Sequence, residues 1–365
     1  MSKIVSISTA LPEFKHDQND ILHFMQNVYA MNETEKRTLR FLYHKSAIQN
    51  RYSAIPDYSL NANEWQFYPA TENLDPFPGI DLRMKWYAKT ACPLSVNAVE
   101  KCIFDKIDKN EITHLITVSC TGMSAPGLDL EILEAMDLPS TIFRTSVNFM
   151  GCYAAIHAMK LADAFCKSDK TAKVLIVCTE LCTLHFQKEN SIDNIASSLL
   201  FGDGSAAILV VNDDHDLPGV KMKNFYSEVA LKGKKEMSWE ISASGFLMTL
   251  SGYVPDLIEQ DFAGLLKNAL HNAGKQESDI SHWCIHPGGK RILDVIEKST
   301  SITENDMKYS LDVLRNYGNM SSPTILFVLK EILDSIENDI MPVANIFGAA
   351  FGPGLTMETF ILSND

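Results

Sequence analysis

The sequence predicts an α/β protein made of two similar halves. Three continuous apolar runs, at residues 112–120, 173–179 and 206–211, are separated by helical patterns. Such runs are typical of strands in a sheet that is covered by helices on both faces. A length of 365 residues exceeds what one simple core accommodates. Beyond about residue 220 the order of helices and strands echoes that of the first part, although no sequence repeat is legible. We therefore expect two related α/β units.

Residues 212–219 form the best boundary in the chain, because they are polar, acidic and rich in turn-forming residues. The sequence thus predicts an N-terminal half over residues 1–213 and a C-terminal half over residues 220–365.

Local patterns place the elements of each half in order. Residues 50–80 are polar, aromatic and proline-bearing without a clear period, so we expect an irregular surface segment there. Elsewhere apolar residues recur at helical spacing or form short runs. In the first half, strands are predicted at 3–9, 112–120, 144–149, 173–179 and 206–211. Helices are predicted at 17–31, 33–44, 84–105 and 190–200, from the end of the loop at 121–127 to about residue 136, and from Cys152 to 165. The second half is predicted to contain helices at 255–273, 289–298 and 322–336, and strands at 282–286, 343–347 and 355–362.

Composition excludes several classes of function. The net charge of −14 leaves no broad basic face, so a nucleic acid is not an expected partner. The eight cysteines form no CxxC pair and no Cys/His cluster with zinc-site spacing, so no metal site is expected. Cysteines inside apolar runs fit a reducing compartment, and no apolar run reaches the length of a membrane helix. We therefore expect a cytoplasmic protein that does not bind a membrane.

Cys152 is the main candidate for a catalytic residue. It follows an apolar run and Gly151 and precedes the small residues that open a helical pattern. A thiol at a helix N-terminus is expected to favour the thiolate, which is the nucleophilic form. On its own, a cysteine in this position is more often a small buried hydrophobic residue.

Two polar loops supply partners for Cys152. His286 ends a predicted strand and precedes Pro-Gly-Gly, so its ring can project from a tight turn. Asn319 stands between Gly318 and Met320 before an apolar helix, where an N-cap is the ordinary alternative. A cysteine, a histidine and an asparagine together suggest covalent catalysis on an acyl group. The Gly202-Asp203-Gly204 segment lacks a phosphate-loop pattern and is expected to be a structural turn.

These loops, with the Phe201-Gly202-Asp203-Gly204 turn and the ending Phe351-Gly352-Pro353-Gly354, resemble the type III polyketide synthases, the chalcone and stilbene synthase family. The resemblance covers about Lys3 to Leu362, and the length without plant-like insertions is more similar to bacterial members. It implies a thiolase-like fold of five layers, αβαβα, and a homodimer. It also implies acyl-CoA starters and malonyl-CoA as substrates, with no metal or other cofactor. Cys152 would carry the starter, while His286 and Asn319 would hold the malonyl thioester carbonyl during decarboxylation.

The resemblance also implies pocket residues. Phe201 matches one of two gatekeeping phenylalanines, and Met248 falls where the second is expected. Lys45 matches a basic residue of the coenzyme tunnel, and Lys36, Arg37 and Arg40 are close to it in sequence. The remaining implied substrate-binding positions are Cys182, His185, Ser321, Gly352, Pro353 and Ala125, the last on a loop that would reach into the partner's site. Several of these residues differ from those of plant enzymes, so a flavonoid product is not expected.

Three other functions remain open at this level. A ketoacyl synthase III-like enzyme would share the Cys, His and Asn but make a single condensation. A papain-like hydrolase would also use these residue types, although its signature around the cysteine is absent. A non-catalytic binding protein would not need all three reactive positions.

Overall fold

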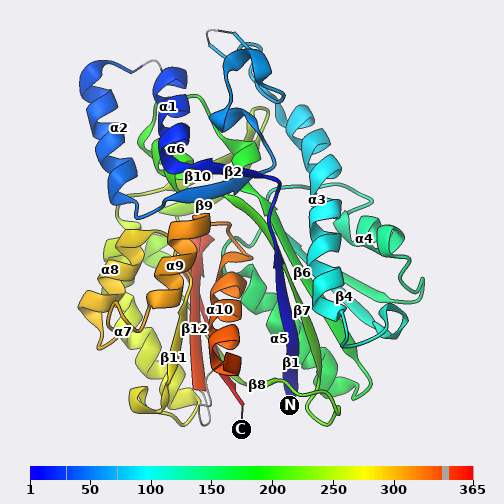
Figure 1. Cartoon of the computed structure of the whole chain (residues 1–365). Coiled ribbons are helices and arrows are strands. Elements are labelled where there is room, and N and C mark those ends of the chain that lie inside the picture. Colours follow the sequence, from blue (N-terminus) through cyan, green and yellow to red (C-terminus); the bar gives the residue numbers. More distant parts are fainter. Residues whose placement is uncertain (30, 72, 339–344, 365) are drawn as a thin grey trace.

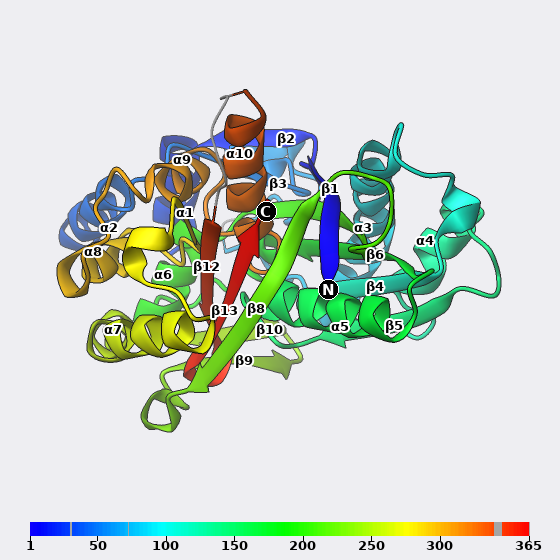
Figure 2. The same cartoon turned by 90° about the horizontal axis from the view of Figure 1, so that it is seen from below.

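The computed structural model describes residues 1–29, 31–71, 73–338 and 345–364. Its main feature is a nine-stranded sheet with the order β11-β12-β13-β8-β1-β7-β6-β4-β5. Figure 2 shows the strands of the two halves on opposite sides of β1. The strands of this sheet are β1 Ser2–Ala10, β4 His114–Ser119, β5 Phe143–Asn148, β6 Lys173–Leu181, β7 Asp203–Asn212, β8 Val220–Val229, β11 His282–Ile285, β12 Asn345–Gly352 and β13 Thr356–Ser363.

Helices cover this sheet in layers (Figure 1). The helices are α1 Gln18–Val28, α2 Glu33–Lys45, α3 Ile80–Ile103, α4 Leu128–Met136, α5 Ala154–Ser168, α6 Ile192–Leu200, α7 Val254–Asn272, α8 Lys290–Ser299, α9 Lys308–Tyr317 and α10 Thr324–Asn338. One hydrophobic cluster packs α3 against the first-half strands, a second packs α5 and α10 between strands of both halves, and a third packs α7 and α8 against the second-half strands. If the first-half strands and the second-half strands of the sheet are counted as separate layers, the order is helix, strands, helix, strands, helix, which gives the expected five layers.

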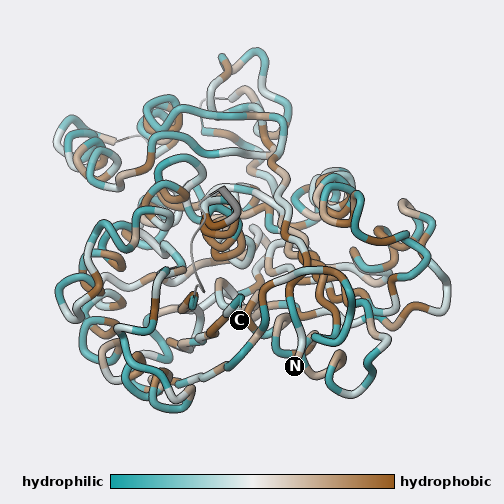
Figure 3. Tube along the Cα trace, turned by 60° about the horizontal axis from the view of Figure 1, so that its bottom comes forward, coloured by the Kyte–Doolittle hydropathy of each residue, from teal (hydrophilic) through white to brown (hydrophobic). Residues whose placement is uncertain are grey.

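The sequence explains why α5 occupies the middle layer. Half of its buried positions are alanines, namely Ala154, Ala155, Ala158 and Ala162, which let a helix approach a sheet closely. Of the strands beside it, β6 is buried from Val174 to Leu181, with Leu175, Ile176 and Val177 all fully inaccessible. Figure 3 shows hydrophobic residues concentrated along these strands and hydrophilic residues on the outer helices.

The two halves meet at a short junction. Residues Ser2–Ile4 of β1 pair antiparallel with Val220–Met222 of β8, directly after the loop at residues 213–219. Within the first half β4 is parallel to both β5 and β6, and within the second half β11 is parallel to β12. Because the carboxyl ends of parallel strands lie at one edge of a sheet, residues that follow β4, β5 and β6 are brought together.

The structure bears out the long buried strands and helices, but it contains elements that the sequence reading did not predict. These are the hairpin of β9 (Met237–Ser242) and β10 (Gly245–Leu250), the pair of β2 (Phe14–Asp17) and β3 (Asn50–Ser53), β8 and α9. They are short or only half-buried, so none of them is a long, fully buried apolar run. The strand predicted at 343–347 begins at Asn345, and residues 343–344 lie outside the described residues. Asp203 opens β7 and accepts N–H bonds from Ala54 and Thr183, both at 2.8 Å, as a structural turn residue does.

Candidate active site

Cys152 lies on the loop between β5 and α5, two residues before the helix begins. Gly151 has a φ of +84°, and a Cβ on it would lie 2.2 Å from Cδ of Pro353. Only glycine accommodates both this conformation and this close approach. The same approach constrains the other segment, because a Cβ on Gly352 would lie 3.2 Å from the backbone nitrogen of Cys152. The turn at the end of β12 therefore fixes the path of the chain into Cys152.

Burial at Cys152 opposes the thiolate that the helix N-terminus favours. Burial raises the pKa of Cys152 to about 11, the nearby Glu180 carboxylate acts in the same direction, and hydrogen bonds with Ser321 and Asn319 oppose the rise. Loss of water around the sulfur therefore outweighs the helix N-terminus. The S–H group is directed at Oδ1 of Asn319, with a sulfur–oxygen distance of 3.9 Å.

Asn319 is held by its backbone and by its side chain. Its N–H donates to the Leu200 carbonyl and its own carbonyl accepts from Gly202 N–H, both at 2.9 Å. Its Oδ1 accepts from the backbone N–H of Ser321 at 2.8 Å. Asn319 lies five residues before α10, and this bond goes to Ser321 rather than to the first turn of that helix. The amide is thus anchored through its oxygen, while its Nδ2 makes only a long contact of 3.4 Å with the Gly288 carbonyl.

His286 follows β11, and its N–H donates to the Ala349 carbonyl of β12 at 2.8 Å. The side chain is 1% exposed, and neither ring nitrogen has a hydrogen-bond partner among the described residues. Burial lowers the pKa of His286 to about 3, so the imidazole is neutral. A neutral imidazole carries one donor and one acceptor nitrogen. The expected bond between His286 and Cys152 is absent from the described structure, and the two groups are a neutral thiol and a neutral ring.

One cavity of about 420 Å³ is lined by Cys152, His286 and Asn319 together. This volume lies within the range of small-molecule sites in proteins. Six of the other predicted residues line the same cavity, namely Lys45, Cys182, Phe201, Met248, Ser321 and Pro353. Ser321 has a φ of +60°, a left-handed conformation that costs energy for a residue with a side chain. Its N–H meets the Asn319 amide because of this conformation.

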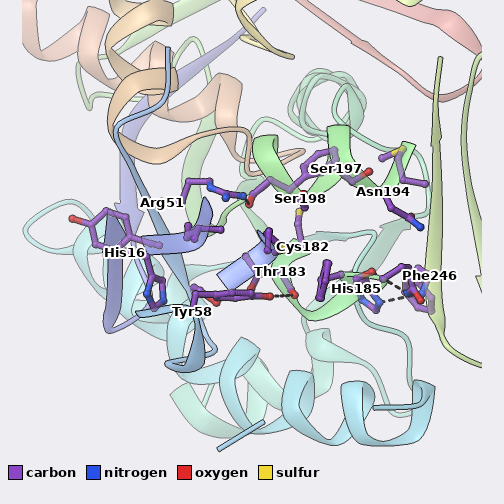
Figure 4. Close-up of a pocket in the computed structure, with 18 of the residues that line it drawn as sticks. His16, Arg51, Tyr58, Cys182, Thr183, His185, Asn194, Ser197, Ser198 and Phe246 are labelled. Carbon is purple, nitrogen blue, oxygen red and sulfur yellow. Dashed lines mark hydrogen bonds between the residues drawn. The ribbon is translucent and has the colours of Figure 1, made fainter. Parts of the chain in front are cut away.

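His185 is not brought into that cavity. It lines a second cavity of about 40 Å³, which Cys182, Phe201 and Met248 also line (Figure 4). Its Nε2–H donates to the Thr121 carbonyl at 2.7 Å, and its Nδ1 accepts from Phe246 N–H at 3.1 Å. Burial lowers the pKa of His185 to about 3. Both ring nitrogens are therefore used to fasten the β9–β10 hairpin to the loop after β4.

Ala125 and Gly352 also lie outside the lining of the 420 Å³ cavity. Ala125 lines a separate depression with residues of β4, β5 and α4. Gly352 ends β12 and abuts Cys152 through the backbone, as described above.

The structure adds residues that sequence reasoning missed. Trp239 of β9 and Cys120 after β4 line the cavity, and the indole Nε1–H donates to the Cys120 carbonyl at 2.7 Å. Trp239 lies on an unpredicted hairpin, so no local signal indicated it. Lys290 and Arg291, at the start of α8, line the cavity too.

Glu180 is a buried carboxylate behind the site. It accepts from Cys120 N–H, Thr121 Oγ1 and Ser322 Oγ, each at 2.8 Å. Burial raises the pKa of Glu180 to about 7, and these three hydrogen bonds oppose the rise. The sequence did contain a signal for this residue, because Glu180 is a charged residue at the end of the apolar run of β6, but it was not among the predicted site residues.

Two negative findings apply to the described residues. They contain no group of three or more His, Cys, Asp or Glu side chains that could hold a metal ion. Over the same ranges, none of the helices combines the length and the apolar character that crossing a membrane requires.

Comparison with known proteins adds to this geometry. Residues 1–214 match the N-terminal domain of chalcone and stilbene synthases, and residues 224–364 match the C-terminal domain. The alpha-pyrone synthesis polyketide synthase-like Pks18 of Mycobacterium tuberculosis is 28% identical over 360 residues, which are 97% of this chain and 89% of that protein. The crystal structure of PKS-I from the brown alga Ectocarpus siliculosus has a TM-score of 0.92 at 26% identity, covering 99% of this chain and 97% of the other.

The 1,3,6,8-tetrahydroxynaphthalene synthase of Streptomyces coelicolor, described as a bacterial type III polyketide synthase, has a TM-score of 0.87 at 26% identity, covering 99% and 98% of the two chains. The two domain matches together account for nearly all of the sequence. The chain therefore belongs to the chalcone and stilbene synthase family, and it is a type III polyketide synthase of the acyltransferase class with a thiolase-like fold.

Proposed function

We propose that this enzyme loads an acyl group from an acyl-CoA onto Cys152 and extends it with malonyl-CoA by decarboxylative Claisen condensation. Cyclisation of the extended chain would then give a pyrone, resorcinol or phloroglucinol-like product. The observation that carries the proposal is the convergence of Cys152, His286 and Asn319 on one cavity, although they come from three separate loops. We propose further that the N-terminal half, 1–213, supplies the nucleophile and the C-terminal half, 220–365, supplies the histidine and the asparagine.

Loading begins from the neutral pair of Cys152 and His286. A thiol whose pKa is raised to about 11 is a poor nucleophile, so its proton has to leave as the sulfur attacks. His286 is suited to accept that proton, because one nitrogen of its neutral ring is an acceptor and neither is engaged within the described structure. The sulfur then bonds to the acyl carbon, and the thiolate of coenzyme A departs with a proton available from the imidazolium.

Extension uses the same two polar side chains as hydrogen-bond donors. The malonyl thioester loses CO2 and leaves an enolate, whose oxygen is negatively charged. Asn319 Nδ2–H and the N–H of neutral His286 are the donors that would meet this oxygen. The enolate carbon attacks the acyl carbon on Cys152, the C–S bond breaks, and the Cys152 thiolate is released. Neither donor carries a charge that would attract the malonyl carboxylate, which has to leave as CO2.

The relatives favour repeated extension over a single condensation. They include proteins described as an alpha-pyrone synthesis polyketide synthase-like enzyme and as a tetrahydroxynaphthalene synthase. Mass spectrometry of products formed with excess malonyl-CoA and short, aromatic and long-chain acyl-CoA starters distinguishes the two. Products with one added two-carbon unit from every starter would support the ketoacyl synthase III-like alternative.

We propose a homodimer as the working form. β5 is an edge strand of the sheet, and the side chain of Phe143 on it is 70% exposed. An exposed edge strand with apolar residues invites pairing with another chain. The loop at 121–127 lies next to β4 and β5, where Ala125 would meet the partner's site. We also propose a reducing compartment, the cytoplasm, because all eight cysteines are free thiols.

The proposed nucleophile is tested with a radiolabelled acyl-CoA. Wild type should retain the label after denaturation, and Cys152→Ala should not. Cys166→Ala is the matched control, since Cys166 is a buried thiol on α5 that lies outside the cavity. Equal labelling of wild type and Cys152→Ala would refute the assignment, whereas unchanged circular dichroism of the variant excludes misfolding.

A further inference from the structure

The C-terminal end of α6 is joined to the Asn319 loop by hydrogen bonds between their backbones. A helix leaves its last carbonyl groups without partners inside the helix. The carbonyl of Leu200 accepts from the N–H of Asn319, and the carbonyl of Asn319 accepts from the N–H of Gly202, both at 2.9 Å. The carbonyl of Phe201, which caps the helix, accepts from Nη1 of Arg51 at 2.7 Å. The backbone of Asn319 is thus bonded to a helix end that Arg51 also binds.

Arg51 lies on β3 and is buried, with an exposed fraction of 3%. Its Nε donates to Oε1 of Gln18 at 2.9 Å, and Nε2 of the same glutamine donates to the carbonyl of Leu199 on α6, also at 2.9 Å. Figure 4 shows Arg51 on the side of the smaller cavity where α6 lies. Both hydrogen-bond acceptors of Arg51 are neutral groups. The negative end of the α6 dipole therefore compensates its charge, as is usual for a cation at a helix C-terminus.

The aliphatic part of Arg51 also contacts the loop that carries Asn319. Gly318, the residue before Asn319, has a φ of +68°, and a Cβ on it would lie 3.0 Å from Cγ and from Cδ of Arg51. The same Cβ would lie 2.7 Å from the carbonyl oxygen of Leu200. Nη2 of Arg51 is buried without a hydrogen-bond partner among the described residues, which costs stability. Stability alone therefore does not account for an arginine between these two segments.

We infer that Arg51 is a positioning residue for the extension step, because it fixes the end of α6 and thereby holds the Asn319 amide at the catalytic cavity. Arg51 lines the 40 Å³ cavity and is not among the residues that line the 420 Å³ cavity, so it acts through Asn319. The inference rests on the proposed function, since it assigns the support of a donor used in decarboxylation. Loading should depend less on Arg51, because the backbone at Cys152 and His286 is held by β12.

The test compares extension with loading in the full-length protein. Arg51→Met should release CO2 from carboxyl-labelled malonyl-CoA about 10–100-fold more slowly than wild type, the loss expected when a catalytic group is displaced by about 1 Å. The loss should appear in kcat rather than in KM, because the Asn319 amide acts on the enolate that forms in the transition state. Transfer of a labelled acyl group to Cys152 should stay close to the wild-type rate. Arg51→Lys should fall between the two proteins, since its ammonium keeps the charge but can reach only one of the two acceptors.

Hydrogen exchange measured by mass spectrometry gives a readout that does not depend on the reaction. The segment 317–322 should exchange faster in Arg51→Met than in wild type, and Arg51→Lys should again be intermediate. Val99→Ala is the matched control, because Val99 is fully buried on α3 and lines neither cavity. Its loss of buried methyl groups should lower the melting temperature. It should leave the exchange of residues 317–322 and the ratio of decarboxylation to loading at their wild-type values.

Two results would overturn the inference. One is a decarboxylation rate of Arg51→Met that equals the wild-type rate, and the other is a loss of loading in the same proportion as the loss of decarboxylation. If Arg51→Met does not fold, Arg51→Lys decides the question by the same two criteria. Faster exchange at residues 317–322 in the variant, together with a wild type that releases no CO2 from malonyl-CoA, would refute the proposed reaction and retain the role of Arg51 in holding the Asn319 loop.

Discussion

Replacement of Asn319 by aspartate separates the two contacts of its amide. Aspartate has nearly the same shape, and its carboxyl oxygen still accepts from the Ser321 N–H, which lies 2.8 Å from Asn319 Oδ1. The Nδ2–H donor is replaced by an oxygen. Loss of one oxyanion donor lowers a rate by roughly 10²–10³-fold, equivalent to about 2.7–4 kcal/mol. We expect Asn319→Asp to decarboxylate malonyl-CoA at least this much more slowly at pH 7.

The pH dependence of this variant provides a second test. Asn319 is 3% exposed, and burial at this position should raise the pKa of a new carboxyl above its ordinary value. Below that pKa the protonated carboxyl carries an O–H that can donate to the enolate oxygen. Decarboxylation by Asn319→Asp should therefore recover in part as the pH falls. Asn319→Ala has no such group and should show no recovery.

The assay follows CO2 released from carboxyl-labelled malonyl-CoA and, in parallel, transfer of a labelled acyl group to Cys152. Loading should persist in both variants, because Cys152 and His286 are unchanged. Asn319→Ala should also have a lower melting temperature, since it leaves the buried N–H of Ser321 without its acceptor. Two results would refute the role given to Asn319. One is a decarboxylation rate of Asn319→Asp at pH 7 that equals the wild-type rate, and the other is an equal recovery of the decarboxylation rate in the aspartate and alanine variants at low pH.

Three further outcomes are expected. Met248→Phe should shift preference towards short starters with little loss of stability, because Met248 lines both cavities and a rigid ring would narrow the passage that a flexible thioether leaves open. A large fall in melting temperature with unchanged starter preference would contradict this. Glu180→Gln should gain stability relative to wild type as the pH rises from 5 to 8. The pKa of Glu180 is raised from 4.5 in the unfolded chain to about 7 in the folded protein, so the folded state holds this proton more tightly. As the pH rises and the carboxyl ionises, wild type loses this contribution to its free energy of unfolding, which is at most about 3 kcal/mol. Parallel melting curves of the two proteins against pH would rule this out. Light scattering at micromolar concentration should give the mass of a dimer, and a monomer mass would count against the β5 interface.

Part of this protein could be predicted without coordinates, because some signals are local. The strands β4, β6 and β7 are continuous apolar runs, and the structure buries them on both faces. The three catalytic candidates, Cys152, His286 and Asn319, lie in loops that contain turn-forming residues. A strand or helix pattern lies on either side of each loop. The alternation of these elements indicated two similar α/β halves, whereas the five-layer order was expected from the resemblance of the loop motifs to a known family.

Other features depend on which distant segments meet, and no local pattern encodes that. His185 follows a buried strand as a pocket residue does, yet Thr121 and Phe246 engage both of its nitrogens. Trp239 lines the cavity from a hairpin of two short strands, which the sequence analysis did not predict. The raised pKa of the Cys152 thiol is also a tertiary property. The helix N-terminus that favours a thiolate is visible in the sequence, but desolvation by loops from both halves outweighs it. Burial is set by all the neighbours of a group at once, so the tertiary structure alone decides which residues face the substrate and in which protonation state.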